Sequence, residues 1–570
     1  MNQKIKLIPL LLFSAFATQA AKDVKVMQYL HAGPITVNKP ILTDSLNVDG
    51  KPFEAKNLVK STIPFGRALG NAAVIDADTA GLITVPTPEK GYALHLYSFY
   101  LNSDRYTKGS LEVSGAGTFE VFVNNKPVGA TSELALEPHR YEVVIKYLTA
   151  DTDTCPSTLT AKFKSEEEAK VIASLDPKKR YTPRDILEGT QFRGTSVSPD
   201  GKYVLVKYYT RMEGGKSEQY AQLRDAATGR ILLQDKGFIL TADWMPTSSK
   251  MYFTRTGMNG KELVTVDPAT MQEEILAENL PEGSFSFTPD EKTLLYTIQE
   301  EGPKDGPDML RILEPNDRLP GFRNRYFIWR YDLQTGLYEQ LTYGHNNTFI
   351  NDVSADSRYL LFSTSEQDYT SLPHSSNSMY KLDLQSMAVD TLWERAKYIN
   401  GATFSPDGKQ LMVFGSGNAF DNIGLNIKEG QISNTYDGQL FLYDPATRKA
   451  KALTKDFNPN VTSAQWNKFD GQIYMLTEDQ DYQRVYTCNP ANGKIRRLDL
   501  PEDVIYNYSL AEAAPVMYYY GQSVSNANRL YSYNTKSKKT QLIYDLSADK
   551  LKDIQFGEVH DWNFTSTDGT

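Results

Sequence analysis

Cysteine and histidine are scarce in this chain, which excludes several kinds of metal site. The only cysteines are Cys155 and Cys488, and two thiols fall short of the four ligands of a usual structural zinc site. No two of the six histidines have the helical i, i+3 or i+4 spacing of an HExxH metal helix. We therefore expect neither a metal nor a cofactor. A disulfide between the cysteines suits an oxidising compartment, but two unpaired, buried thiols are the simpler interpretation.

Positive charge is also in short supply. Lysine and arginine number 61 against 70 aspartates and glutamates, which gives a net charge of −9 at pH 7. A protein that binds nucleic acid needs a basic surface to neutralise phosphates. We therefore expect no nucleic-acid partner.

Long hydrophobic runs are missing, apart from one near the N-terminus. Lys4 and Lys6 precede an apolar run at 7–16, and small residues follow up to Ala20. The run is too short to span a bilayer, and this order of charge, apolar run and small residues is typical of a cleavable signal peptide. We expect residues 1–20 to be removed and the mature chain to be secreted or periplasmic, with no membrane span. The alternative is a buried N-terminal helix.

Aromatic and turn-forming residues are abundant instead. The chain has 35 Tyr, 25 Phe, 37 Gly and 28 Pro, a composition that favours strands and turns over helices. We predict an all-β protein. Residues 21–165 show short alternating segments at 91–101, 110–114, 118–123 and 140–148, which predict an antiparallel β-sandwich.

The sandwich pattern resembles the jelly rolls that carry carbohydrate-binding modules. Tyr97, Phe99 and Tyr100 are candidates for a sugar-binding platform, but core packing is the more frequent role of such residues. Residues 166–190 predict a linker with a short helix. The charged stretch 164–170 has a helical composition, and Pro183 after Thr182 is a helix-start signal.

Residues 191–545 contain an internal repeat, which decides the fold of this region. One half of the unit is a strand, a turn such as Ser-Pro-Asp-Gly, and a second strand, first seen at 195–208. The other half is a strand that ends in Asp or Asn, a turn and a closing strand. Its seven copies centre on Asp225, Asp267, Asp332, Asp383, Asp444, Asn489 and Asn534. Four strands per unit indicate a seven-bladed β-propeller.

Two units are longer than the others. Their insertions, at about 300–325 and 415–437, fall between the second and third strands, so both should emerge on one face and mark a working surface. The second is rich in glycine but lacks the strand-loop-helix context of a phosphate-binding loop, which argues against nucleotide binding. The first carries the charged candidates for substrate binding, which are Glu300, Glu301, Arg318, Arg323 and Arg325.

The last residues predict an unfinished hairpin. Residues 559–565 alternate with a strand period, and Asp568-Gly569 is a strong hairpin-turn signal that requires a second strand. We therefore interpret 546–570 as an exit linker and the first hairpin strand of a further domain. On this interpretation the sequence is a fragment of a longer protein.

The propeller turns, the two insertions and the exit segment 562–570 together resemble the prolyl oligopeptidase family of serine peptidases. The segments 317–325 and 419–424 are similar to its secreted, dipeptidyl-peptidase-like members from Bacteroidetes. The resemblance covers about residues 170–570. It implies that the propeller caps an α/β-hydrolase domain with a Ser, Asp, His triad, which would begin where this chain ends.

No catalytic residue is assigned within the chain. The nucleophile elbow Gly-x-Ser-x-Gly is absent, because the sequences around Ser196 and Ser523 both lack the second glycine. Exopeptidases of the resembled family hold the substrate amine with a pair of glutamates, a role that suits Glu300 and Glu301 by charge. The alternative is a solvated loop. The three arginines could hold a substrate carboxylate or carbonyl, or simply fix the long loop.

The sequence therefore predicts the non-catalytic, N-terminal part of a secreted prolyl-oligopeptidase-type serine peptidase. Its propeller would gate and select peptide substrates, and its partners would be those peptides and the hydrolase domain; we leave a homodimer open. The alternative is a stand-alone periplasmic propeller that binds a glycan or a protein partner.

Overall fold

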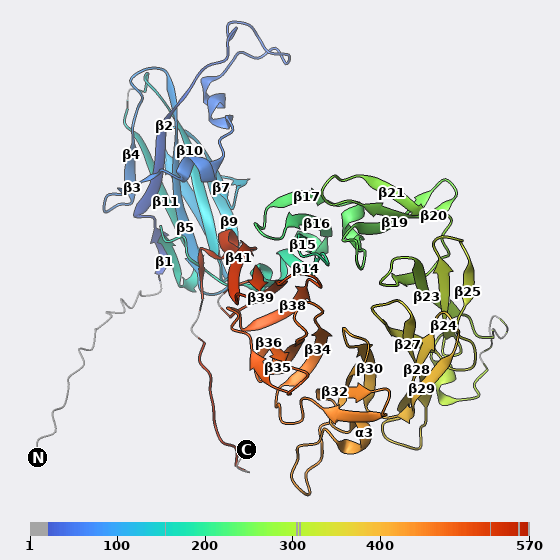
Figure 1. Cartoon of the computed structure of the whole chain (residues 1–570). Helices are drawn as coiled ribbons and strands as arrows, with labels where there is room; N and C mark the ends of the chain where they lie inside the picture. Colours follow the sequence, from blue (N-terminus) through green and yellow to red (C-terminus); the bar gives the residue numbers. More distant parts are fainter. Residues whose placement is uncertain are drawn as a thin grey trace, which may run out of the picture. The chain divides into compact units, whose positions relative to one another are not determined.

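The computed structural model describes residues 21–153, 155–303, 306, 309, 311–524, 526–556 and 559–567. The chain divides into two compact units, one of residues 1–186 with 552–570 and one of residues 187–551 (Figure 1). Strands dominate both, which confirms the predicted all-β class. No helix in these ranges is both long and apolar enough to cross a membrane. The predicted signal peptide, residues 1–20, lies outside the described residues.

The first unit is a β-sandwich, as predicted. One sheet has the order β1–β11–β6–β9, with β4 on β11, and the other has the order β3–β2–β5–β10–β7–β8, with β12 on β5. The strands of the first sheet are β1 (Ala21–Lys25), β4 (Leu82–Val85), β6 (Thr107–Gly115), β9 (Thr131–Leu136) and β11 (Ser157–Ala169). Those of the second are β2 (Gln28–Val37), β3 (Ala73–Asp76), β5 (Tyr92–Ser103), β7 (Thr118–Val123), β8 (Lys126–Val128), β10 (Arg140–Ala150) and β12 (Val171–Ser174).

The sandwich core is aromatic. Tyr97, Phe99, Tyr147 and Phe163 are fully buried between the two sheets, so Tyr97 and Phe99 serve packing and not a sugar platform. Tyr100 is half-buried, and the guanidinium of Arg140 lies over its ring at 4.4 Å from the centroid. Short helices accompany this unit: η1 (Ala55–Lys60), α1 (Phe65–Leu69) and α2 (Pro183–Leu187).

The expected helix at 164–170 is wrong, whereas the short helix at Pro183 is confirmed. Residues 157–169 form β11, which pairs with β1 on one side and β6 on the other. Hydrogen bonds to strands on both sides outweigh the weak local preference of a charged stretch for helix. Helix α2 is capped as predicted, since Thr182 Oγ1 accepts a hydrogen bond from the Asp185 backbone N–H at 3.3 Å.

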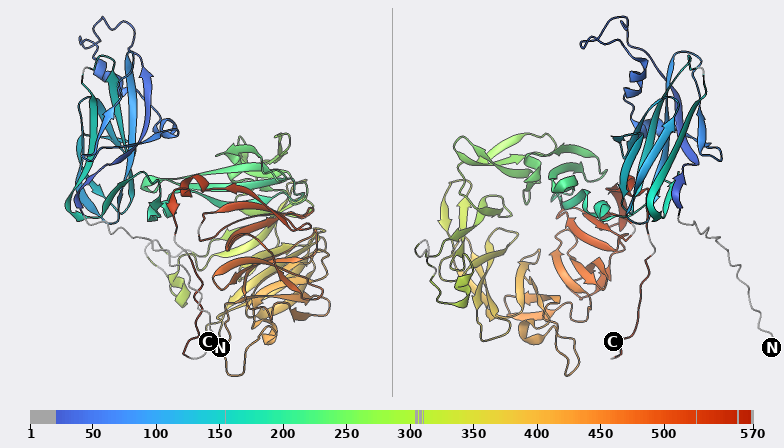
Figure 2. Two further views of the ribbon diagram at one scale, coloured as in Figure 1. Left: turned by 90° about the vertical axis from the view of Figure 1, so that its left-hand side faces the viewer. Right: turned by 180° about the vertical axis from the view of Figure 1, so that it is seen from behind.

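The second unit is a seven-bladed β-propeller, as predicted. Each blade has four antiparallel strands consecutive in sequence, and the blades form a ring (Figures 1 and 2). The last two blades are joined into one sheet by a parallel pairing of Gln483 with Val504. The strands of the first three blades are β14 (Gly189–Val197), β15 (Tyr203–Arg211), β16 (Ser217–Asp225) and β17 (Ile231–Asp235); β18 (Asp243–Trp244), β19 (Met251–Gly257), β20 (Gly260–Val266) and β21 (Glu273–Ala277); and β22 (Ser284–Phe287), β23 (Thr293–Glu300), β24 (Arg325–Asp332) and β25 (Tyr338–Gln340).

The remaining four blades follow in the same order. Their strands are β26 (Thr348–Val353), β27 (Tyr359–Gln367), β28 (Ser375–Asp383) and β29 (Val389–Ala396); β30 (Ile399–Phe404), β31 (Leu411–Ser416), β32 (Gly438–Asp444) and β33 (Lys449–Ala452); β34 (Asn460–Trp466), β35 (Ile473–Asp479), β36 (Tyr482–Cys488) and β37 (Ile495–Arg497); and β38 (Val504–Leu510), β39 (Val516–Gln522), β40 (Arg529–Asn534) and β41 (Lys539–Asp545). Short helices lie between or after strands: η2 (Glu213–Gly215), η3 (Phe238–Leu240), η4 (Pro315–Arg318), α3 (Ala419–Asn422) and α4 (Ala548–Leu551).

The recurring Ser-Pro-Asp-Gly turn has a structural explanation. In the first blade, Ser198 Oγ donates to Asp200 Oδ1 at 2.7 Å and accepts the Tyr203 backbone N–H at 3.0 Å. Gly201 takes a left-handed conformation with φ of 73°. The Asx residue of the other half-unit acts similarly, since Asp225 Oδ1 accepts the Thr228 N–H at 2.8 Å. These side chains close turns, so the motif repeats for a local reason.

The described strands of the first and seventh blades do not pair with each other, so side chains and loop backbone close the ring. The backbone N–H groups of Glu512 and Ala513 donate to the Pro199 carbonyl at 3.1 and 2.9 Å. The Tyr518 hydroxyl of β39 donates to the carbonyl of Ala226, just after β16, at 2.9 Å. The Val197 N–H of β14 donates to Ser509 Oγ of β38 at 2.9 Å. An apolar cluster that includes Tyr208 and Leu530 fills the same junction.

Two further expectations need correction. Residues 559–567 form no strand, because a strand requires a neighbour for its backbone groups; the hairpin signal Asp568-Gly569 lies outside the described residues. Just before them, β42 (Ile554–Gln555) pairs in parallel with β13 (Lys179–Arg180). Cys155 and Cys488 are unpaired as expected, but Cys155 is exposed and only Cys488 is buried. Burial raises the pKa of the Cys488 thiol to about 11.

Candidate functional site

Both long insertions lie where the repeat predicted. The first joins β23 to β24 and the second joins β31 to β32, each between the second and third strands of its blade. Because strands alternate in direction, these connections share one face of the ring, on which the chain also enters β14 and leaves β41. We call it the insertion face. The opposite face carries the tight turns and is called the turn face.

The first insertion is organised around one ion pair. Asp317, in η4, is buried, and its carboxylate accepts two hydrogen bonds from Arg323, from Nε at 2.7 Å and from Nη2 at 2.8 Å. The same carboxylate accepts the backbone N–H groups of Leu313 at 2.7 Å and Glu314 at 2.9 Å. The Arg323 bonds, together with those backbone bonds, hold the pKa of the Asp317 carboxyl well below its usual range. Arg323 therefore fixes the loop.

Arg325 also fixes this loop. Its Nη1 donates to the carbonyls of Phe322 and Asn324, each at 2.9 Å, and its Nε donates to the carbonyl of His345. Arg325 is directly opposite Glu300 in the β23–β24 pairing. The exposed Glu300 carboxylate accepts from Gln340 Nε2 at 3.3 Å.

Glu301 and Arg318 complete the predicted set, and both side chains are exposed. All five residues thus lie in or beside the first insertion. Arg323 and Arg325 support the loop, whereas the two glutamates and Arg318 present charge to solvent. A substrate-binding role for the five residues stays a prediction.

The second insertion packs its start onto the blade and exposes the rest. Phe420 has φ of 51° and lies in an aromatic cluster with Trp393 and Phe441. Further along, Ile432 and Tyr436 are almost fully exposed, at 96% and 93%. Apolar side chains are exposed in the first insertion as well, at Met309, Ile312, Leu313 and Leu319.

These exposed apolar residues were not predicted from the sequence, in which the insertions were found by their length and the candidate residues were chosen by charge. The sequence did hold a signal for these exposed residues, because isolated Ile, Leu and Tyr residues occur within the two insertions, outside any predicted strand. A contiguous group of exposed apolar side chains marks a surface that meets another protein or domain, and these residues are the candidates for such a group. Asn316 of the first insertion also donates to the Tyr369 hydroxyl, in the connection between β27 and β28.

On the turn face, the middle of the ring holds a cavity of about 420 Å³. Asp352 lines it, and its carboxylate accepts the backbone N–H groups of Phe404 at 2.7 Å and Val353 at 2.8 Å. Burial raises the pKa of this carboxyl. Lys468 and Glu512 form an ion pair on the same cavity wall. Within the described residues, no three His, Cys, Asp or Glu side chains are placed to hold a metal ion.

Most of this propeller matches the model of a known protein family. The family model of the SMP-30/Gluconolactonase/LRE-like region matches residues 241–531, just over half of the chain. The chain belongs to this family. The family region begins just before β18 and ends in β40, so it lies within the propeller. No curated protein matches the sequence.

Several similar solved structures are peptidases or peptidase domains. Pyrococcus horikoshii acylaminoacyl peptidase has 13% identity and a TM-score of 0.48, with 66% of this chain and 56% of that chain covered. The propeller domain of the Trilobed protease from Pyrococcus furiosus has 12% identity and a TM-score of 0.42, with 63% and 96% covered. An oligogalacturonate lyase in complex with manganese has 13% identity and a TM-score of 0.38, with 62% and 84% covered.

Proposed function

We propose that this chain is the propeller-bearing part of a secreted serine peptidase of the prolyl oligopeptidase type. In this proposal residues 1–20 direct export, and a hydrolase domain after this chain performs the acyl transfer. The propeller selects peptides before they reach that domain. A relative of the dipeptidyl-peptidase-like kind is the specific form that we propose.

One observation carries the proposal. The two long insertions, with their exposed apolar residues, leave the face on which the chain enters and leaves the ring. A domain that continues the chain from that face would meet the insertions. Peptides held there would have their reactive bond near the added domain. Long loops on one face are where binding functions concentrate in scaffolds of this kind.

Glu300 and Glu301 then provide the proposed selectivity for a free N-terminus. Both carboxylates are exposed on the insertion face, at the end of β23. A substrate ammonium there would gain charge-assisted hydrogen bonds, which are stronger than neutral ones. Arg318, exposed on the same insertion, is the arginine that we propose to meet a substrate carbonyl or carboxylate.

The test is an activity comparison between two proteins. Residues 21–570 alone should not hydrolyse a chromogenic Xaa-Pro dipeptide, because no elbow serine is present to form an acyl-enzyme. The protein extended by the reading frame that follows Thr570 should hydrolyse it. A reading frame that stops directly after Thr570 would refute the proposal and favour a propeller that only binds a partner. An extended protein that hydrolyses none of the peptides tested would do the same.

A further inference from the structure

A second cavity lies between the sixth and seventh blades on the turn face, away from both insertions. Its volume is about 430 Å³, within the range of sites for small organic ligands. Three turns contribute to it: the β34–β35 turn and the β36–β37 turn of blade six, and the β40–β41 turn of blade seven. Tyr474 and Tyr533, both buried, are among its lining residues.

The cavity has the opposite charge to the protein. Four basic residues line it against two acidic ones, Asp470 and Asp499, although the whole chain has a net charge of −9; the basic residues are Lys494, Arg496, Arg497 and Lys538. None of the four forms an ion pair with another described residue. Basic residues of blade two, in contrast, are paired, as in Lys250–Glu274 at 3.0 Å and Arg255–Glu262 at 2.9 Å.

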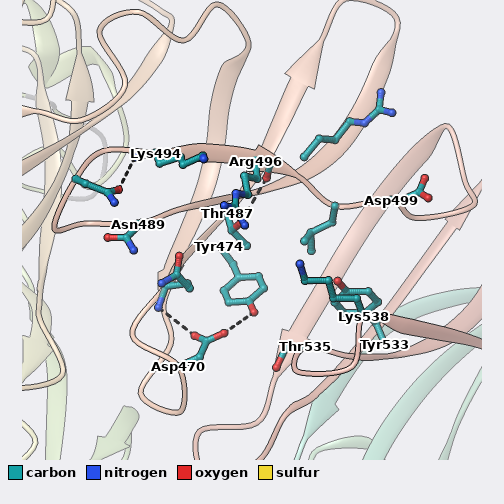
Figure 3. A pocket seen from close by; sticks show the side chains of 14 residues that line it. Asp470, Tyr474, Thr487, Asn489, Lys494, Arg496, Asp499, Tyr533, Thr535 and Lys538 are labelled. Atoms are coloured by element: carbon teal, nitrogen blue, oxygen red, sulfur yellow. Dashed lines mark hydrogen bonds between the residues drawn. The ribbon is translucent and has the colours of Figure 1, made fainter.

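Unpaired cations of this kind repel each other, and a bound anion would relieve that repulsion. Figure 3 shows Lys494 and Lys538 extending toward the middle of the cavity from opposite sides, while Asp499 lies apart at its edge. The guanidinium of Arg496 adds a planar fork that matches a carboxylate. The positive side of the cavity therefore fits one anionic group.

The other side of the cavity offers acceptors and hydroxyls. The Tyr474 hydroxyl donates to Asp470 Oδ2 at 2.8 Å, and the Gln472 N–H donates to Asp470 Oδ1 at 3.0 Å, so the carboxylate is held in place (Figure 3). Asn489 and Thr535 also line this region. A fixed carboxylate beside an amide would repel a second anion but accept hydrogen bonds from ligand hydroxyls.

We propose that this cavity binds an acidic saccharide unit. Its carboxylate would face Lys494, Arg496 and Lys538, and its ring hydroxyls would face Asp470 and Asn489. The site lies on the opposite face from the proposed peptide-selecting surface, so it is independent of the peptidase assignment. A bound saccharide would contact both blades six and seven.

The experiment titrates residues 21–570 with three probes in a calorimeter at low salt. D-glucuronate has both the carboxylate and the hydroxyls, D-glucose has only hydroxyls, and sodium sulfate has only the anion. Glucuronate should bind at least about tenfold more tightly than either of the others, because only it uses both sides of the cavity. Equal affinity for glucuronate and sulfate would reject a saccharide site, and no glucuronate binding would reject the proposal entirely.

Matched variants locate the binding. Lys538→Gln should weaken glucuronate binding about tenfold, whereas Lys536→Gln should leave it unchanged, because Lys536 is exposed in the same turn but does not line the cavity. Asp470→Asn should weaken glucuronate binding while strengthening or sparing that of sulfate. Equal effects of Lys536→Gln and Lys538→Gln would indicate general surface charge and overturn the proposal, as would an Asp470→Asn variant that binds both anions more tightly.

Discussion

The closure of the ring leads to a sharp prediction about one hydroxyl. Tyr518→Phe removes the donor that joins blade seven to the Ala226 carbonyl beyond β16 in blade one. Tyr518 is completely buried and Ala226 is 4% exposed, so water cannot easily replace the bond. Burial also raises the pKa of Tyr518, which keeps the hydroxyl protonated as a donor at neutral pH.

The expected size follows from the carbonyl that is left unpaired. Losing one partner of a buried hydrogen bond destabilises a protein by about 1–3 kcal/mol. Because no strand crosses from blade one to blade seven, this loss should act on the junction between them. Opening of that junction should become about 5- to 150-fold more frequent, the factor that corresponds to this free energy.

Amide hydrogen exchange measures this opening by segment. Peptides from β14, β38 and β39 should exchange faster in Tyr518→Phe, while those of blades three and four keep their rates. The control is Tyr296→Phe in blade three, which removes a buried hydroxyl that has no hydrogen-bond partner among the described residues. It should leave stability unchanged or raise it, because an unpaired polar group is lost.

Two results would refute this reasoning. Unchanged exchange at the junction in Tyr518→Phe would mean that the other contacts there, which are the apolar cluster and the remaining hydrogen bonds, are enough to close the ring. Equal destabilisation by Tyr518→Phe and Tyr296→Phe would mean that the hydroxyl contributes through packing and not through its bond to Ala226.

Three further predictions concern charge, thiols and pH. In a catalytically active extended protein, Glu300→Gln with Glu301→Gln should raise the Michaelis constant for a free-amine substrate about tenfold or more and leave that for an N-blocked substrate unchanged. If the ratio of the two Michaelis constants does not change, both residues belong to a solvated loop with no role in binding. Native protein should react with one equivalent of a thiol reagent at Cys155, and with two only after unfolding, because Cys488 is buried; two fast thiols in native protein would contradict this. Burial lowers the pKa of His95 to about 4, so as the pH falls the unfolded chain binds a proton at this residue before the folded protein does. The folded protein should therefore keep its full stability above pH 6.5 and lose part of it between pH 6.5 and pH 4. If the urea midpoint of His95→Gln has the same pH dependence as that of the unmodified protein, the prediction is wrong.

The repeat made the propeller predictable from sequence. Side chains such as Ser198 and Asp200 form hydrogen bonds within their own turn, so the same residue types recur wherever the same turn recurs. The positions of both insertions followed from the spacing between these turns. Local chemistry of this kind leaves a readable pattern, which explains why seven blades could be counted without a structure.

Non-local contacts were not predictable in the same way. The charged stretch at 164–170 has no local reason to be a strand, and only its pairing with β1 and β6 decides its form. The bond between Arg323 and Asp317 depends on how a long loop folds back, so the sequence could offer two roles for Arg323 without choosing between them. The cavity between blades six and seven combines three turns that no single motif connects.

The two faces of the ring differ in the lengths of their connections between strands. On the turn face, Asx and serine side chains fix most of the turns, as in the bond from the Thr228 N–H to Asp225, and the lengths of these turns are nearly constant. On the insertion face, the connections between second and third strands vary widely in length, because a loop can grow at little entropic cost. A preformed polar cavity is therefore expected on the turn face, and surfaces adapted to large partners on the insertion face, where the exposed Ile432 and Tyr436 lie.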